Sequence, residues 1–205
     1  MVELAVRAFL TLFVLVDPVG LAPVFLGLTS SRSPTERERI ARRAVLIAAA
    51  LLILFALGGA WLLDNLHISL DAFRTAGGVL LFRIAVDMVF AHFERETKAE
   101  ENEARARNDI SVFPLAIPLI AGPGALASLM ILAGESRGHA FGLPVLLAVC
   151  MVVVALAYVA LRLASRVATL LGPTGINVVT RVLGVLLAAL ATQYVADGVL
   201  GLLRP

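Results

Sequence analysis

Asp17 is the residue whose type and position in this sequence most strongly indicate chemistry. It interrupts an apolar segment that, at ~20 residues, is long enough to cross a bilayer. An ionisable side chain at membrane depth is costly and is therefore a functional candidate. Because Asp is a favoured N-cap and Pro is favoured at the first helical position, Asp17 and Pro18 predict the start of a second half-helix. Gly20 and Pro23 belong to the same interruption, and a purely structural cap at Asp17 is the competing interpretation.

A second interruption follows one half of the chain later. Pro118 and Pro123 repeat the spacing of the first two prolines, and Gly122 and Gly124 flank the second of them. Broken helices are tolerated in a membrane where they face protein or a wet cavity, and matched breaks in two halves indicate a transporter's binding site. Half-helix N-termini present free N–H groups and a partial positive charge that can bind a carboxylate. Against the simpler interpretation that these residues only kink the helices, the sequence predicts one central substrate site formed by Asp17, Pro18, Gly20, Pro23, Pro118, Gly122, Pro123 and Gly124.

Arg83 and Asp87 are four positions apart in the third apolar segment and therefore share a helix face. One interpretation is a mutual ion pair that lets both charges sit in the membrane. The other is ion coupling, in which Asp17 or Asp87 exchanges a proton or holds Na⁺ and Arg83 is the counter-charge. Arg74 and Arg181 lie closer to segment ends, where long basic side chains reach the membrane interface.

Polar residues also occur in the last apolar segment. Four of them could line a polar path: Thr180, Thr192, Gln193 and Asp197. The Thr and Gln side chains could equally hydrogen-bond to neighbouring helices, which is the commoner use of such residues in membranes. Gly77 and Gly78 in the third segment favour close helix packing.

The composition excludes an ordinary soluble protein. Hydrophobic residues make up 60% of the chain and charged residues 16%, and the mean hydropathy is +0.95. The single Cys150 excludes an internal disulfide. Motifs for phosphate binding, nucleophilic catalysis and nucleic-acid binding are absent, and His67, His92 and His139 sit in or beside connections rather than clustering as ligands. We therefore expect no enzyme, no cofactor, no metal and no nucleic-acid partner.

Hydropathy predicts six membrane-spanning helices, at about Ala5–Gly27, Arg43–Leu63, Leu70–Ala91, Ser111–Ala133, Leu143–Leu163 and Val178–Leu203. The first, third and fifth connections together carry eleven Lys or Arg residues, against three on the opposite side. Because positively charged loops stay cytoplasmic, both termini are expected outside the cytoplasm of a cell inner membrane.

The chain divides into two three-span halves, residues 1–91 and 111–205, joined by a charged cytoplasmic connector at 92–110. Gly78-Val79-Leu80-Leu81 recurs as Gly184-Val185-Leu186-Leu187 in the third span of the second half. Because each half has an odd number of spans, the second half must insert upside down relative to the first. The predicted fold is therefore all-α, a polytopic 3+3 inverted repeat with broken helices one and four.

Four blocks, which follow one another over nearly the whole chain, resemble the MarC family of membrane proteins. They are Asp17-Pro18-Val19-Gly20 with Pro23 and Phe25, Phe73-x-x-Ala76-Gly77-Gly78-x-Leu80-Leu81-Phe82, Pro114 to Ala125, and Thr180-Arg181-Val182-Leu183-Gly184. The resemblance implies a six-span inner-membrane protein and transport of small neutral amino acids. Arg83 departs from the family pattern, in which an apolar residue would look more usual.

These observations predict a secondary transporter of a small neutral solute, most simply an amino acid such as alanine or glycine, that works by alternating access coupled to H⁺ or Na⁺. The expected partners are this solute, the coupling ion and membrane lipid, and a homo-oligomer is compatible with the sequence. The alternative is a non-transporting inner-membrane protein that binds a partner or has a structural role.

Overall fold

The computed structural model describes residues 1–30, 32–90, 109–136 and 141–203, and helices dominate these residues, with no strand among them. The elements are α1 (Val2–Val16), α2 (Pro18–Leu28), α3 (Pro34–Asn65), α4 (Leu70–Val89), η1 (Ser111–Ile120), α6 (Pro123–Ser136), α7 (Gly142–Arg162) and α8 (Ala164–Leu202). The all-α prediction is confirmed. Almost all of the predicted connector at 92–110 lies outside the described residues, as do His92 and His139.

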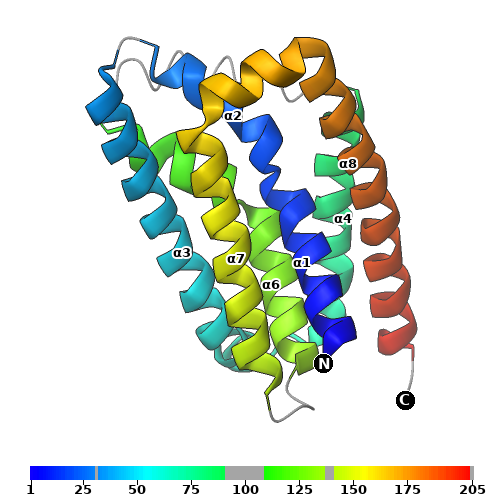
Figure 1. Cartoon of the computed structure of the whole chain (residues 1–205). Coiled ribbons are helices and arrows are strands. Elements are labelled where there is room, and N and C mark those ends of the chain that lie inside the picture. The colour runs from blue at the N-terminus through cyan, green and yellow to red at the C-terminus, as the bar shows by residue number, and fades with distance from the viewer. Residues whose placement is uncertain (31, 91–108, 137–140, 204–205) are drawn as a thin grey trace.

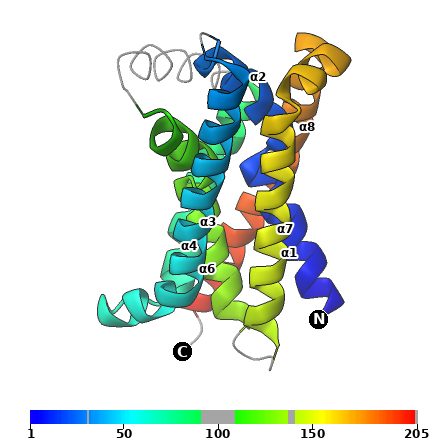
Figure 2. The same ribbon diagram turned by 60° about the vertical axis from the view of Figure 1, so that its left-hand side comes forward.

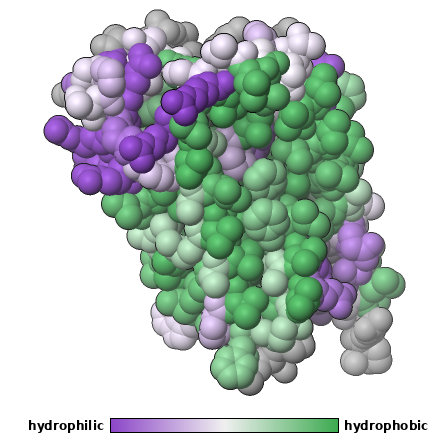
Figure 3. Space-filling view, viewed as in Figure 1, coloured by the Kyte–Doolittle hydropathy of each residue, from purple (hydrophilic) through white to green (hydrophobic). Residues whose placement is uncertain are grey.

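Several helices are suited to a membrane. Val2–Leu28 (α1 with α2), α3, α7 and α8 are each long and apolar enough to cross one, and η1 with α6 adds a fifth candidate that is bent by 53°. α4 has 20 residues but contains four charged ones, so it has too many charges to count among these candidates. Figure 3 shows apolar side chains over the middle of the visible face and hydrophilic ones mainly at one end. The chain is a multi-helix membrane protein, and the count of six spans stays a prediction.

The helices run alternately in opposite directions. In Figure 1 both chain termini lie at the lower end, α1 and α2 run upward, α3 runs down and α4 runs up. In the second half η1 and α6 run down, α7 runs up and α8 returns to the lower end. Figure 2 shows the same order after rotation. Each element of the second half thus runs opposite to its counterpart in the first, as the inverted-repeat prediction requires, although the exact symmetry stays a prediction.

Repeated glycines determine how α4 and α8 pack. A Cβ added to Gly78 of α4 would lie 2.8 Å from the Ala191 carbonyl oxygen of α8. A Cβ on Gly184, the matching residue in α8, would lie 2.9 Å from Met88 Cβ of α4. Both glycines therefore allow the facing helix to approach closely. The recurring sequence block thus makes a close helix–helix contact in both halves.

Most helix boundaries lie within about three residues of the predicted ones, and two differ by more. α3 begins at Pro34, nine residues before the predicted start, because the Ser33 side chain accepts a hydrogen bond from the Glu36 N–H while Glu36 bonds the Ser33 N–H in return. Residues 164–177, which separate the predicted fifth and sixth spans, belong to α8, because this helix already begins at Ala164. This helix bends at Gly172, where φ is +61°, and its first segment lies across the upper end of the bundle in Figure 1.

The core occupies two adjoining regions. The larger packs α1, α2, α3, η1, α6 and α7 around residues such as Leu12, Leu52 and Leu129, which are at most 1% exposed. The smaller lies between α4 and α8 and includes Leu81 and Leu187, the last residues of the recurring block. At the first break Val16 and Pro18 are buried and Asp17 is half-buried; at the second, Ala121 and Gly124 are buried, Gly122 is half-buried and Pro123 is exposed.

Candidate functional site

The first helix break is centred on Asp17. Its backbone is left-handed, with φ at +41° and ψ at +68°, so α1 ends at Val16 and α2 begins at Pro18. Asp17 Oδ1 accepts a hydrogen bond of 3.0 Å from the Gly20 N–H, which is the geometry of an N-cap. The predicted start of a second half-helix at this residue is confirmed.

The second carboxylate oxygen of Asp17 connects this break to the last helix. Thr180 Oγ1 on α8 donates a hydrogen bond of 3.1 Å to Asp17 Oδ2. A Cβ on Gly20 would lie 2.9 Å from Asp17 Cγ and 3.2 Å from Thr180 Oγ1. Gly20 is therefore needed because the carboxylate and hydroxyl approach the backbone closely, and Thr180, which the sequence suggested for a polar path, contacts the candidate carboxylate.

The second break lies at Ala121 and Gly122. η1 ends at Ile120, where the Ala121 N–H still bonds the Ala116 carbonyl at 2.9 Å, and α6 begins at Pro123 as predicted. A Cβ at Gly122 would collide with the Pro118 carbonyl oxygen, so this bend requires glycine. Gly122 precedes Pro123 as Asp17 precedes Pro18, so the second break has no carboxylate at the matching position.

The two breaks lie next to each other in the fold. Leu15 precedes the first break by two residues, and its Cδ2 atom would be 3.2 Å from a Cβ on Gly124, just past the second break. Leu81 and Ile84 of α4 cover the same glycine at 2.9 and 3.0 Å. Three apolar side chains thus cover Gly124, in the first turn of α6, in this conformation. Pockets of about 240 and 210 Å³ lie elsewhere, beside the first turns of α3.

The charged pair in α4 is formed as its spacing predicts. Arg83 Nε lies 3.3 Å from Asp87 Oδ2, and the Arg83 side chain is 69% exposed whereas that of Asp87 is 17% exposed. The ion-pair interpretation is confirmed, and the coupling role of Asp87 stays a prediction. Gln193 and Asp197 likewise bond each other, at 2.7 Å along α8.

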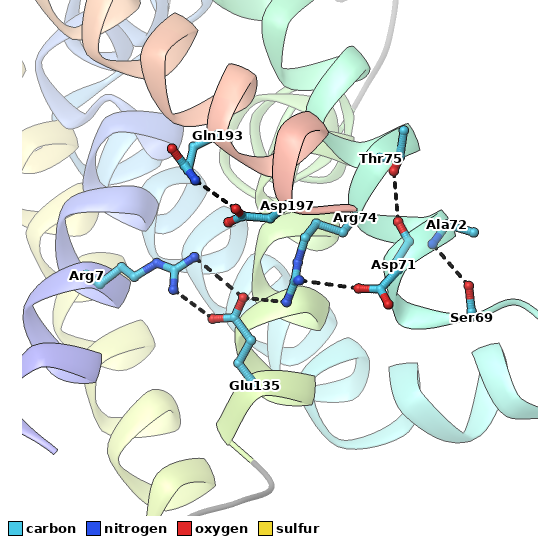
Figure 4. Close-up of polar contacts among 9 residues, drawn as sticks. All are labelled: Arg7, Ser69, Asp71, Ala72, Arg74, Thr75, Glu135, Gln193 and Asp197. Carbon is cyan, nitrogen blue, oxygen red and sulfur yellow. Dashed lines mark hydrogen bonds and ion pairs between the residues drawn. The ribbon is translucent and has the colours of Figure 1, made fainter. Parts of the chain in front are cut away.

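A charged network that the sequence analysis missed lies at the lower end of the bundle (Figure 4). Glu135 at the end of α6 accepts from Arg74 of α4 at 2.7 Å and from Arg7 of α1 at 3.0 Å. Arg74 also lies 3.4 Å from Asp71. The Arg74 side chain is only 15% exposed because it is bound to the carboxylates of Glu135 and Asp71, and its position at the membrane interface stays a prediction. Arg181 is exposed, as predicted.

A signal for this network exists in the sequence. In a chain of alternating direction, the starts of spans one and three and the end of span four share one side. Arg7, Asp71, Arg74 and Glu135 are charged residues near those ends. The alternating topology brings the Glu135 carboxylate to Arg74, beside the Asp71 carboxylate of its own helix.

The fold and the paired breaks define an α-helical integral membrane protein with several spanning helices. The sequence matches the family model described as "MarC family integral membrane protein" over residues 2–203, and the chain belongs to this family. It is 38% identical to a UPF0056 membrane protein of Methanocaldococcus jannaschii, with 97% of each chain covered. It is 33% identical to the UPF0056 membrane protein YvbG of Bacillus subtilis, covering 98% of this chain and 97% of that one. It is also 36% identical to the UPF0056 membrane protein YhcE of Escherichia coli, covering 96% and 92%. No solved structure matches the chain.

Proposed function

We propose that this chain is a secondary transporter of a small neutral solute, most simply an amino acid, that works by alternating access coupled to H⁺ or Na⁺. The observation that carries the proposal is the pair of helix breaks, at Asp17 and at Gly122, on oppositely running elements that meet inside the bundle. Broken helices that face each other in the protein interior are the usual location of transporter binding sites. The matching glycine contacts between α4 and α8 support the interpretation that the two halves of the chain share one fold.

The chemistry of the breaks favours a zwitterion. At the first break Asp17 already accepts the Gly20 N–H, so its carboxylate occupies the N-terminus of α2. At the second break Gly122 supplies no carboxylate, which leaves the N-terminus of α6 for an anionic group of the solute. A neutral amino acid would place its ammonium toward Asp17 and its carboxylate toward the N-terminus of α6, so that each charged group of the solute faces a group of opposite polarity. Asp17 or Asp87 would carry the coupling ion.

Access to this site requires movement. Leu15, Leu81 and Ile84 cover Gly124 in the described conformation, so α1 or α4 must shift relative to α6 before a solute reaches the break. Relative motion of two bundles around a central site is the general form of alternating access. The basic first connection supports a cytoplasmic location for the upper end in Figure 1, and thus termini outside the cytoplasm of a cell inner membrane.

The test is flux in vesicles reconstituted with purified protein. Labelled alanine and glycine are supplied with an imposed proton or Na⁺ gradient, and uptake is compared between the parent, Asp17→Asn and a matched control, Asp64→Asn. We expect gradient-driven uptake in the parent and in the exposed Asp64 control, and a loss of at least ~10-fold with Asp17→Asn, the factor that corresponds to ~1.4 kcal/mol. Asn caps a helix nearly as well as Asp, so Asp17→Asn should still insert and fold.

One outcome would favour the alternative, a membrane protein that binds a partner or stabilises an assembly without transport. It is the absence of gradient-dependent flux of any small neutral solute in protein shown to be folded by its circular dichroism and monodisperse elution. Full flux with Asp17→Asn would retain transport but contradict the proposed role of Asp17 in it, and would restrict Asp17 to capping α2.

A further inference from the structure

The charged network of Arg7, Asp71, Arg74 and Glu135 joins three helices at the end of the bundle that holds both termini (Figure 4). We propose that this network is a gate that closes the terminal end of the transport path and opens when Glu135 releases Arg7 and Arg74. The inference rests on the proposed function, because a gate has meaning only if a solute passes between the breaks and this end.

The network lies in line with the second break along α6. Gly124, Ser128, Ile131 and Glu135 are spaced by four, three and four residues and therefore share one helix face. At the break, Leu15, Leu81 and Ile84 cover Gly124. Nearer the terminal end, Ile131 Cδ1 would be 3.4 Å from a Cβ on Gly77 of α4. Glu135 then binds α1 and α4 together, so the seam between α1, α4 and α6 is closed by an apolar layer followed by an ionic one.

Glu135 is the member on which the network depends. Its side chain is 20% exposed and lies between two guanidinium groups, which belong to different helices. The four residues have no net charge together. If the charge of Glu135 is removed by substitution, Arg7 and Arg74 remain near each other with only Asp71 to balance them, and like-charge repulsion favours separation of α1 from α4. Closure of the gate therefore depends on the negative charge of one carboxylate, that of Glu135.

The matching positions of the other half carry no charge. Aligning the two breaks pairs Arg7 with Val112 and Glu135 with Ser30, and aligning the recurring glycine blocks pairs Arg74 with Thr180. The matched positions therefore repeat no ion pair, and Thr180 bonds Asp17 instead. The opposite end has interhelical ion pairs of its own, such as Glu38 with Arg162, but that pair joins α3 to α7 and not the seam between α1, α4 and α6. At the terminal end the network holds this seam closed, and opening it requires breaking the ion pairs of Glu135.

The experiment measures how fast a buried reporter is alkylated. Cys150 is the chain's one cysteine and is replaced by Ala, and Ser128→Cys supplies a reporter thiol two turns from Glu135. Ser128 is fully buried, and its hydroxyl has no hydrogen-bond partner among the described residues, so the exchange for cysteine removes no hydrogen bond within them. A membrane-impermeant charged thiol reagent is added to each side of sealed vesicles, and labelling is followed over time without any solute.

We expect Glu135→Gln to raise the labelling rate from the terminal side by ~10-fold or more, which corresponds to ~1.4 kcal/mol in the opening equilibrium. Glu38→Gln is the matched control, because Glu38 also binds two groups between helices, the Tyr158 hydroxyl and Arg162, at the opposite end. It should leave the rate unchanged. Arg7→Gln keeps the ion pair of Arg74 and Glu135 and should therefore give a smaller rise in the labelling rate. It is the test variant if Glu135→Gln does not fold.

An unchanged labelling rate in both Glu135→Gln and Arg7→Gln would overturn the gate and leave the network as a structural tie. This result is distinguishable from failure of the proposed function, because labelling needs no substrate. Faster labelling without solute flux in the parent would retain a charge-controlled opening and contradict transport. Normal flux with unchanged labelling would retain transport and contradict the gate.

Discussion

Gly20→Ala tests whether the close approach of Asp17 and Thr180 organises the first break. A Cβ at residue 20 would lie 2.9 Å from Asp17 Cγ and 3.2 Å from Thr180 Oγ1, both closer than a relaxed contact. The carboxylate would have to rotate away from its two donors. Losing an N-cap costs ~1 kcal/mol, and a polar contact between membrane helices averages ~0.6 kcal/mol. If the carboxylate stays, overpacking costs about 1–3 kcal/mol.

Gly58→Ala is the matched control for this change. Gly58 lies in the interior of α3, and a Cβ there meets nothing within 4 Å. Alanine is the better helix former by about 0.8–1.0 kcal/mol, so Gly58→Ala should stabilise the protein by that amount. The same gain at residue 20 partly offsets the lost hydrogen bonds, ~1.6 kcal/mol together, and leaves a net loss of ~0.7 kcal/mol. Because the helix-propensity gain is common to both variants, they should differ in the free energy of unfolding by ~1.6 kcal/mol, the value of the lost hydrogen bonds.

The assay is reversible unfolding of purified protein in mixed micelles, followed by helical circular dichroism as denaturing detergent is increased. Reconstituted Gly20→Ala should also lose solute flux, because Asp17 no longer holds its position, whereas Gly58→Ala should retain it. The reasoning is refuted if Gly20→Ala is as stable as Gly58→Ala. In that case the carboxylate moves at no cost and neither Gly20 nor Thr180 positions it.

Three further changes test the surrounding structure. Gly78→Ala should destabilise the protein by about 1–3 kcal/mol in the same unfolding assay, because its Cβ would lie 2.8 Å from the Ala191 carbonyl oxygen. Ser33→Ala removes the N-cap of α3 and should cost ~1 kcal/mol, seen as faster amide exchange confined to the first turn of that helix. The pKa of Asp109 is lowered, mainly by the hydrogen bond that it accepts from the Ser111 hydroxyl. The ionised Asp109 carboxylate therefore stabilises the folded protein above the ordinary carboxyl pKa of ~3.9, and this stabilisation is lost as the pH falls through the lowered pKa. Ser111→Ala should raise that pKa in a carboxyl NMR titration.

The helix breaks could be predicted from sequence to the residue because their causes are local. Asp17 followed by Pro18 combines an N-cap with a residue favoured at the first helical position, and α2 begins there. Gly122 and Pro123 have the same order, and α6 begins at Pro123. Neither prediction required knowledge of the neighbouring helices.

Helix length was harder to predict because hydropathy reports the part of a helix that meets lipid. α3 has 32 residues, or ~48 Å at 1.5 Å per residue, and so exceeds the ~30 Å hydrocarbon core. The start signal at Ser33 and Pro34 was present in the sequence but lies among charged residues. The bend at Gly172 similarly lets one helix turn from the bundle end into the membrane.

Partners distant in the chain could not be predicted, because they depend on which helices become neighbours. Glu135 is 61 residues from Arg74 and 128 from Arg7, and Asp17 is 163 residues from Thr180. No local pattern links such positions. The alternating direction of the spans places Arg7, Arg74 and Glu135 on one side but does not say that one carboxylate binds both guanidiniums.

The two halves share a scaffold and differ in chemistry, and this difference gives the proposed cycle a direction. Asp17 is matched by Gly122, so only one break carries a carboxylate. Arg74 is matched by Thr180, and Arg74 helps to tie the terminal end while Thr180 orients Asp17. Under the proposed function, equivalent backbone positions would contact the solute's ammonium group in one half and form the gate in the other. A symmetric frame would give two similar conformations, and the proposed gate would favour the one in which the terminal end is closed while the site is empty.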